Sequence, residues 1–108
     1  MNRPHLLFAA AGLALVLAAP RAQARDPVAR GRALVKEFCA RCHSIGRTGR
    51  SPHLGAPPLR TIGRSYDLDR FAERLQRGIS SGHPDMPEVI FKRADARAVQ
   101  AYLRAIQR

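Results

Sequence analysis

The 108-residue sequence contains no tryptophan and only two cysteines and two methionines. Two cysteines allow one disulfide at most, whereas a chain this short usually needs a disulfide, metal, cofactor or partner to complete its core. The apolar stretch of residues 6–19 is shorter than the roughly 18 to 20 residues of a membrane-spanning helix. The sequence therefore indicates one small domain whose core is completed by something other than disulfides.

The first 24 residues have the three parts of a secretory signal peptide. A positively charged start precedes the apolar stretch, and Ala22-Gln23-Ala24 supplies the small residues that signal peptidase accepts. We expect cleavage after Ala24, which leaves residues 25–108 as one exported domain. An uncleaved N-terminal anchor is the alternative.

Acidic residues are scarce in the expected mature chain. Of the 19 Lys and Arg residues, 17 follow Ala24, as do all eight acidic residues, so this part carries a net charge of +9. A field of that sign favours acidic protein surfaces, anionic lipid or nucleic acid. Because the chain is predicted to be exported, we expect no nucleic-acid partner.

The apolar residues of the mature chain have helical spacing, without the alternation of strands. Asp26 predicts the start of a first helix that ends at Cys39. A second helix is predicted from Asp67 to Gly78 and a third from Arg93 to Gln107, with loops over 46–63 and 82–87. The predicted inner faces are Gly31, Leu34, Val35 and Phe38, then Leu68, Phe71, Ala72 and Leu75, then Ala98, Val99, Tyr102, Leu103, Ala105 and Ile106. The sequence predicts an all-α fold of about three helices with irregular loops.

Cys39-Ala40-Arg41-Cys42-His43 has the Cys-x-x-Cys-His pattern that attaches a c-type haem. Two thiols one turn apart can add to the two vinyl groups of one porphyrin, and the adjacent imidazole then sits beneath the iron. A disulfide in so small a loop would stabilise little, a thiol-redox motif would lie in a βαβ unit, and a zinc site needs four ligands. We therefore predict one haem c, bound through thioethers to Cys39 and Cys42, with His43 as an iron ligand.

The predicted haem also solves the problem of the small core. A porphyrin is a large apolar plate, and wrapping it buries surface that the few hydrophobic side chains cannot bury among themselves. We expect the haem-free chain to be largely unfolded, because ligand binding and folding are coupled in such small domains.

Met86 is the candidate for the sixth position on the iron. It is the only methionine besides Met1, and it lies in a loop whose two prolines restrict the backbone. Because Met86 is not on a helical face, we predict that it is an axial ligand rather than a core residue. His53 and His83 are rival ligands, each interpreted as a solvent-facing loop histidine.

Residues 27–107 resemble a small class I bacterial cytochrome c. Gly31 stands eight residues before Cys39, as in that family, where this glycine packs against an aromatic residue of the C-terminal helix, here Tyr102. The resemblance implies the cytochrome c fold, in which helices and loops wrap one covalent haem.

Two loops extend the resemblance. The segment Ala56-Pro57-Pro58-Leu59 is similar to the family's proline loop, and Met86-Pro87 matches its distal loop. The resemblance implies that the carbonyl group of Pro57 accepts the proton of the His43 imidazole.

The sequence departs from the family pattern at two points. Val35 stands where the family often has an aromatic residue, so we expect a looser contact between the first and last helices. The chain has no tryptophan to donate to a haem propionate. Tyr66, Arg60 and Arg64 are candidates to replace it, and ordinary loop roles are the alternative.

The resemblance implies a periplasmic one-electron carrier rather than an enzyme. We expect it to be a monomer or the haem subunit of a larger complex, without stable membrane insertion. Its basic surface would dock on acidic patches of redox partner proteins, and Arg41, Arg47 and Arg50 are candidate docking residues. Beyond the haem motif, no nucleophile–base arrangement or paired carboxylates point to an enzyme.

Two other functions stay open at this point. The haem subunit of a periplasmic dehydrogenase would co-purify with a larger catalytic chain. A gas-binding or sensory haem protein would bind carbon monoxide in its reduced state.

Overall fold

The computed structural model describes residue 12 and residues 26–79 and 82–108, so the predicted signal peptide lies almost entirely outside the described residues. The described chain forms α2 (Pro27–Phe38), the 3-10 helices η1 (Leu59–Arg64) and η2 (Leu68–Arg70), α3 (Phe71–Arg77) and α4 (Arg93–Ile106). This part contains no strand beyond a single antiparallel bridge between Ile79 and Val89. The predicted all-α fold is confirmed. No helix in the described ranges is long and apolar enough to cross a membrane.

The first helix begins where its sequence predicts. The Asp26 carboxylate accepts hydrogen bonds from the backbone N–H groups of Val28 (3.0 Å) and Ala29 (3.3 Å). Pro27 lies in the first turn, where backbone N–H groups have no acceptor within the helix. Proline lacks an N–H group, so no hydrogen bond is lost there. α2 therefore starts at a fixed point and ends twelve residues later, immediately before Cys39.

Two predicted elements differ from the structure. The predicted loop over 46–63 contains the start of η1, because Leu59 and Ile62, three residues apart, are both buried on one side of a 3-10 turn. The helix predicted from Asp67 begins as η2 and becomes α-helical only at Phe71. The Asp67 side chain accepts from the N–H of Asp69, which closes a tight first turn.

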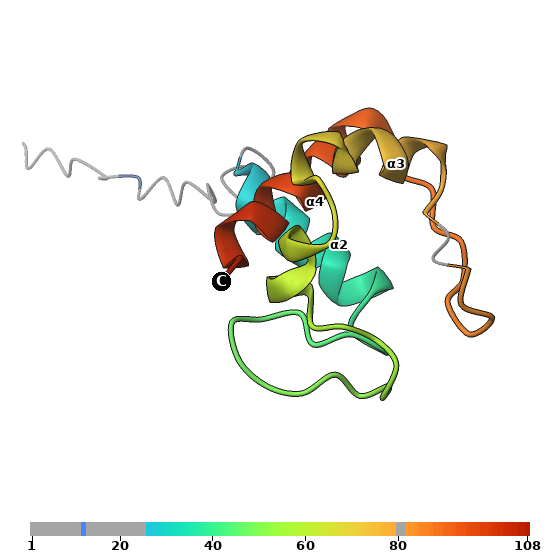
Figure 1. The fold of residues 1–108 in the computed structure, drawn as a ribbon. Coiled ribbons are helices and arrows are strands. Elements are labelled where there is room, and N and C mark those ends of the chain that lie inside the picture. Colours follow the sequence, from blue (N-terminus) through green and yellow to red (C-terminus); the bar gives the residue numbers. More distant parts are fainter. Residues whose placement is uncertain (1–11, 13–25, 80–81) are drawn as a thin grey trace, which may run out of the picture.

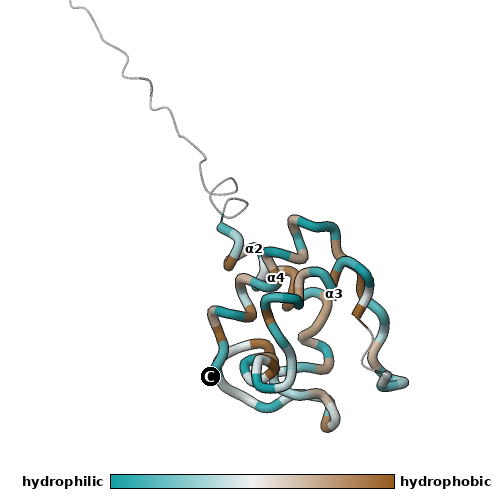
Figure 2. The backbone as a smooth tube through the Cα atoms, turned by 45° about the horizontal axis from the view of Figure 1, so that its top comes forward, coloured by the Kyte–Doolittle hydropathy of each residue, from teal (hydrophilic) through white to brown (hydrophobic). Residues whose placement is uncertain are grey.

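α4 is the central helix, because α2 packs along it and α3 packs against it as well (Figure 1). Figure 2 shows hydrophobic and hydrophilic positions alternating along the helices, as expected for one buried and one exposed face. Ala105, predicted beside the inner face of α4, is exposed, and Ala96 is fully buried instead. Phe38, predicted on the inner face of α2, is 46% exposed.

α2 and α4 approach most closely at Gly31. A Cβ atom added there would overlap the carbonyl oxygen of Ala98 and lie 2.8 Å from the Cβ of Tyr102. Only a residue without a side chain lets the two backbones touch at this point. Val35, one turn later, is 0% exposed, so the looser helix contact expected beside it is not observed.

Replacing Gly31 by alanine should destabilise the haem-loaded protein by about 1–3 kcal/mol, the usual range for overpacking a tight contact. The loss should appear although alanine is the better helix former. Guanidinium denaturation measures it. Gly46→Ala is the control, since a Cβ added at Gly46 meets no atom within 4 Å. Equal stability of the two variants would contradict the close helix contact.

Candidate functional site

The Cys-x-x-Cys-His motif continues the last turn of α2. The N–H of Cys39 donates to the carbonyl group of Val35 at 2.8 Å. The carbonyl group of Cys39 in turn accepts from the N–H groups of Cys42 (3.2 Å) and His43 (2.9 Å). These bonds wind residues 39–43 into further turns and bring both sulfur-bearing side chains and the imidazole to one cavity.

The residues predicted to attach the haem, to ligate its iron and to orient the histidine all line one cavity, which has a volume of about 1080 Å³. They are Cys39, Cys42, His43, Pro57 and Met86. The volume lies just above the roughly 300–1,000 Å³ that small-molecule and cofactor sites span, as expected for a large cofactor. The structure therefore joins residues of the first loop and of the loop that precedes α4, which are far apart in the sequence.

The wall of the cavity includes large apolar side chains that the protein does not cover. Phe38, Tyr66 and Ile90 line it and are 46%, 40% and 64% exposed. The ring of Phe38 meets that of Phe91 edge to face, with centroids 5.3 Å apart. Because exposed apolar surface of this size mostly marks a binding site, the wall fits a large apolar group such as a porphyrin.

The surroundings of Cys39 favour an uncharged sulfur. Burial raises the pKa of its thiol to about 11, because the thiolate would lose its hydration. At neutral pH this thiol is protonated and is a poor nucleophile and a poor metal ligand. A thioether carries no charge to desolvate, so the environment fits haem attachment better than a redox-active thiol. Cys39 and Cys42 form no disulfide.

The imidazole of His43 is oriented by the proline loop. Its Nδ1 lies 2.7 Å from the carbonyl oxygen of Pro57. A carbonyl group can only accept, so Nδ1 carries the proton and Nε2 is left as the unprotonated nitrogen, the form that binds a metal. A hydrogen bond of this kind fixes the ring and raises the basicity of the ligating nitrogen.

Ser44, which the sequence does not single out, organises the loop that follows the motif. It is buried, and its N–H donates to the hydroxyl oxygen of Ser51 at 2.9 Å. Its carbonyl group accepts from the N–H of Leu59 (2.9 Å), and its hydroxyl oxygen accepts from the guanidinium group of Arg60 (3.0 Å). Arg60 therefore braces the loop and is not among the residues that line the cavity.

The other two propionate candidates also differ from each other. Tyr66 lines the cavity, whereas Arg64 is exposed and does not. Arg74 lies at the cavity with its guanidinium carbon 4.9 Å from the centre of the Tyr66 ring. The sequence analysis did not identify Arg74. The one signal for it is weak: Arg74 directly precedes Leu75, which was predicted to lie on the buried face of its helix. The structure thus puts one aromatic and one cationic side chain together at this wall.

The three candidate docking residues have different surroundings. Arg47 donates to the carbonyl group of Ala105 at 2.9 Å, so its guanidinium group holds the last turn of α4. Arg41 is exposed and lies at the cavity. Arg50 is exposed away from the cavity lining.

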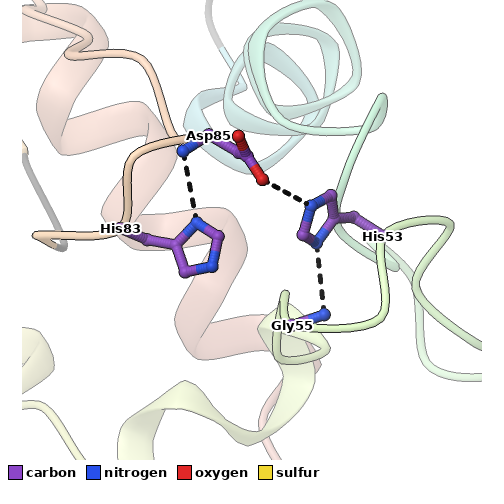
Figure 3. A network of polar contacts seen from close by, with 4 residues as sticks. All are labelled: His53, Gly55, His83 and Asp85. Carbon is purple, nitrogen blue, oxygen red and sulfur yellow. Dashed lines mark hydrogen bonds and ion pairs between the residues drawn. The ribbon is translucent and has the colours of Figure 1, made fainter.

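The rival ligands His53 and His83 both line the cavity, and Figure 3 shows them in one polar network with Asp85. Nε2 of His53 lies 3.3 Å from a carboxylate oxygen of Asp85, whose N–H donates to Nδ1 of His83 at 3.3 Å. The interpretation of His53 as a solvent-facing histidine is therefore incomplete, because its side chain contacts Asp85 in the other loop. Within the described residues, no group of three or more His, Cys, Asp or Glu side chains could hold a metal ion.

Tyr102 ties α4 to the loop behind the motif, since its hydroxyl group donates to the carbonyl group of Ile45 at 2.5 Å. Tyr102→Phe should destabilise the haem-loaded protein by about 1 kcal/mol, because it leaves a part-buried carbonyl group without its partner. Chemical denaturation of the two proteins measures the difference. Tyr66→Phe, at a half-exposed ring, should change stability by less than about 0.5 kcal/mol. A Tyr102→Phe variant as stable as the parent would show that this bond contributes nothing.

A comparison with protein-family models matches residues 28–107 to the family described as Cytochrome c. No significant match to a curated protein or to a solved structure was found. The matched range includes the Cys-x-x-Cys-His motif, the proline loop, Met86 and α4 up to its end.

Proposed function

The chain belongs to the cytochrome c family, whose members bind haem c covalently, and from this we propose that it is a class I, periplasmic one-electron carrier. Cys39 and Cys42 would hold the haem through thioethers, and His43 and Met86 would ligate its iron. The observation that carries this proposal is that all four side chains line one cavity with uncovered apolar walls.

When bound, the haem supplies a one-electron couple at its iron. The residues around it would hold the iron in both oxidation states. His43 is held by its bond to Pro57, and the thioether of Met86 favours the ferrous state and raises the potential. The apolar side chains of the cavity exclude water. A protein that holds both ligands in this way would have little to rearrange when the iron gains or loses an electron.

The turn that carries Met86 has a restricted backbone conformation. The N–H of Met86 donates to the carbonyl group of His83 at 3.1 Å, which closes a four-residue turn. Pro84 occupies the second position of that turn, where its restricted φ angle is favoured. The sulfur is thereby presented from a short, stiff segment rather than from a helix.

The partners that we propose are redox proteins with acidic docking surfaces, and not nucleic acids. The basic charge of the expected mature chain steers such encounters and gives weak, short-lived complexes. Arg41 is the docking residue that we favour, because it is exposed beside the cavity, whereas Arg47 is engaged within the fold. In this role the chain passes electrons and performs no catalysis of its own, as a monomer or as the haem subunit of a complex.

The optical spectrum of the haem-loaded protein tests the ligation. We expect a low-spin ferric spectrum with the weak far-red band of sulfur bound to iron, and no change when carbon monoxide is added to the ferrous protein. Met86→Ala should lose the band and take up carbon monoxide, because it opens a position on the iron. His83→Ala is the control and should keep the band. Carbon monoxide binding by the parent protein would instead favour the gas-binding function.

Ionic strength tests the basic surface. We expect oxidation by the anion hexacyanoferrate(III) to slow about tenfold between low and high salt, and oxidation by a tris(phenanthroline)cobalt(III) cation to accelerate, because salt screens the field around the haem edge. Arg41→Glu should reduce both effects more than Arg97→Glu, an exposed residue of α4 outside the cavity lining. Identical salt dependence of the two oxidants would contradict electrostatic steering.

A further inference from the structure

The cavity is bordered by a contact between two loops that lie far apart in the sequence (Figure 3). His53 belongs to the loop that follows the haem motif, and Asp85 immediately precedes Met86. Nε2 of His53 lies 3.3 Å from Oδ2 of Asp85. The rings of His53 and His83 also meet edge to face, with centroids 5.6 Å apart. The segment that carries Met86 is thus in contact with the segment that carries Pro57.

The His53 side of this contact is firmly held. Its N–H donates to the carbonyl group of Cys42 at 3.1 Å, and its own carbonyl group accepts from the N–H of Ala56 at 3.1 Å. The N–H of Gly55 donates to Nδ1 of His53 at 3.1 Å. Because Nδ1 accepts a hydrogen bond, the proton resides on Nε2, which donates it to the carboxylate of Asp85. Both ring nitrogens are therefore engaged, which leaves neither free to bind iron.

The other side of the contact is the turn that presents Met86. The N–H of Asp85 donates to Nδ1 of His83 (3.3 Å), and the N–H of Met86 donates to the carbonyl group of His83 (3.1 Å). Asp85 directly precedes Met86, so a contact that restrains the side chain of Asp85 also restrains the position of Met86. At the base of the same loop, the N–H of Ile79 donates to the carbonyl group of Val89 at 3.2 Å.

We propose that the His53–Asp85 contact is a clasp that keeps the Met86 turn closed over the haem, which makes His53 a positioning residue for Met86. The proposal rests on the proposed ligation of iron by Met86. Without the clasp, the turn opens more often, and a ligand from solution competes better for the iron. The side chains of His53 and Asp85 are 37% and 66% exposed, so the effect is several-fold rather than thousand-fold.

The test measures the affinity of the ferric, haem-loaded protein for added imidazole. The optical spectrum of the protein reports the binding. We expect His53→Ala and Asp85→Ala each to raise the affinity about fivefold, the order of one hydrogen bond. The double variant should be no higher than either single one, because both changes remove the same contact. His53→Gln, which keeps an N–H donor toward Asp85, should restore part of the parent behaviour. Leu54→Ala is the matched control, since Leu54 is fully exposed in the same loop.

Additive effects of the two single changes, or an unchanged affinity in His53→Ala, would overturn the clasp while leaving Met86 ligation standing. A parent protein that lacks the sulfur–iron band and already binds imidazole like His53→Ala would overturn both proposals. Nitrogen-15 NMR of the ferrous, haem-loaded protein gives an independent reading. The clasp requires the proton of His53 on Nε2, and a proton on Nδ1 would contradict it.

Discussion

The cavity at the end of α2 is the constraint on which the rest of this small fold depends. Its walls carry apolar rings and aliphatic chains that the protein's own residues leave exposed, Phe38, Tyr66 and Ile90 among them. In the part of the chain that the structure describes, no element covers these side chains, so we expect the covalent haem to be part of the core as well as the redox centre. We therefore expect binding of the cofactor and completion of the fold to be one process.

The contact between α2 and α4 positions the residues that attach the cofactor. Gly31 lets the helix backbones touch, and Tyr102 then reaches from α4 to the loop behind the motif. Asp26 determines where α2 starts, and twelve residues later the helix delivers Cys39 to the cavity. A single helix, anchored at its start and pressed against α4 in its first half, thus decides where the haem is attached.

Local features of the sequence predicted most of this arrangement. The cap at Asp26, the Cys-x-x-Cys-His motif and the apolar face of α4 each depend on residues within a few positions of one another. The family resemblance implied two contacts between distant segments, Gly31 with Tyr102 and Pro57 with His43. Other contacts of this kind were missed, because no spacing encodes them. His53 with Asp85 and Arg47 with Ala105 are of this kind. The start of η1 was missed for a different reason: its 3-10 turn lies among glycines and prolines that elsewhere mark irregular loop.

The two axial ligands that we propose are held very differently by the protein. On the proximal side, His43 follows two attachment points, and its ring is oriented by a 2.7 Å bond to a backbone carbonyl group of a stiff proline loop. On the distal side, Met86 is presented by a turn whose tie to the opposite loop is a part-exposed pair of side chains. Exposed pairs contribute little stability, and loops with few buried contacts open first. With the ligands that we propose, any change of ligand at the iron should therefore begin with Met86, while His43 and the covalent attachment remain in place.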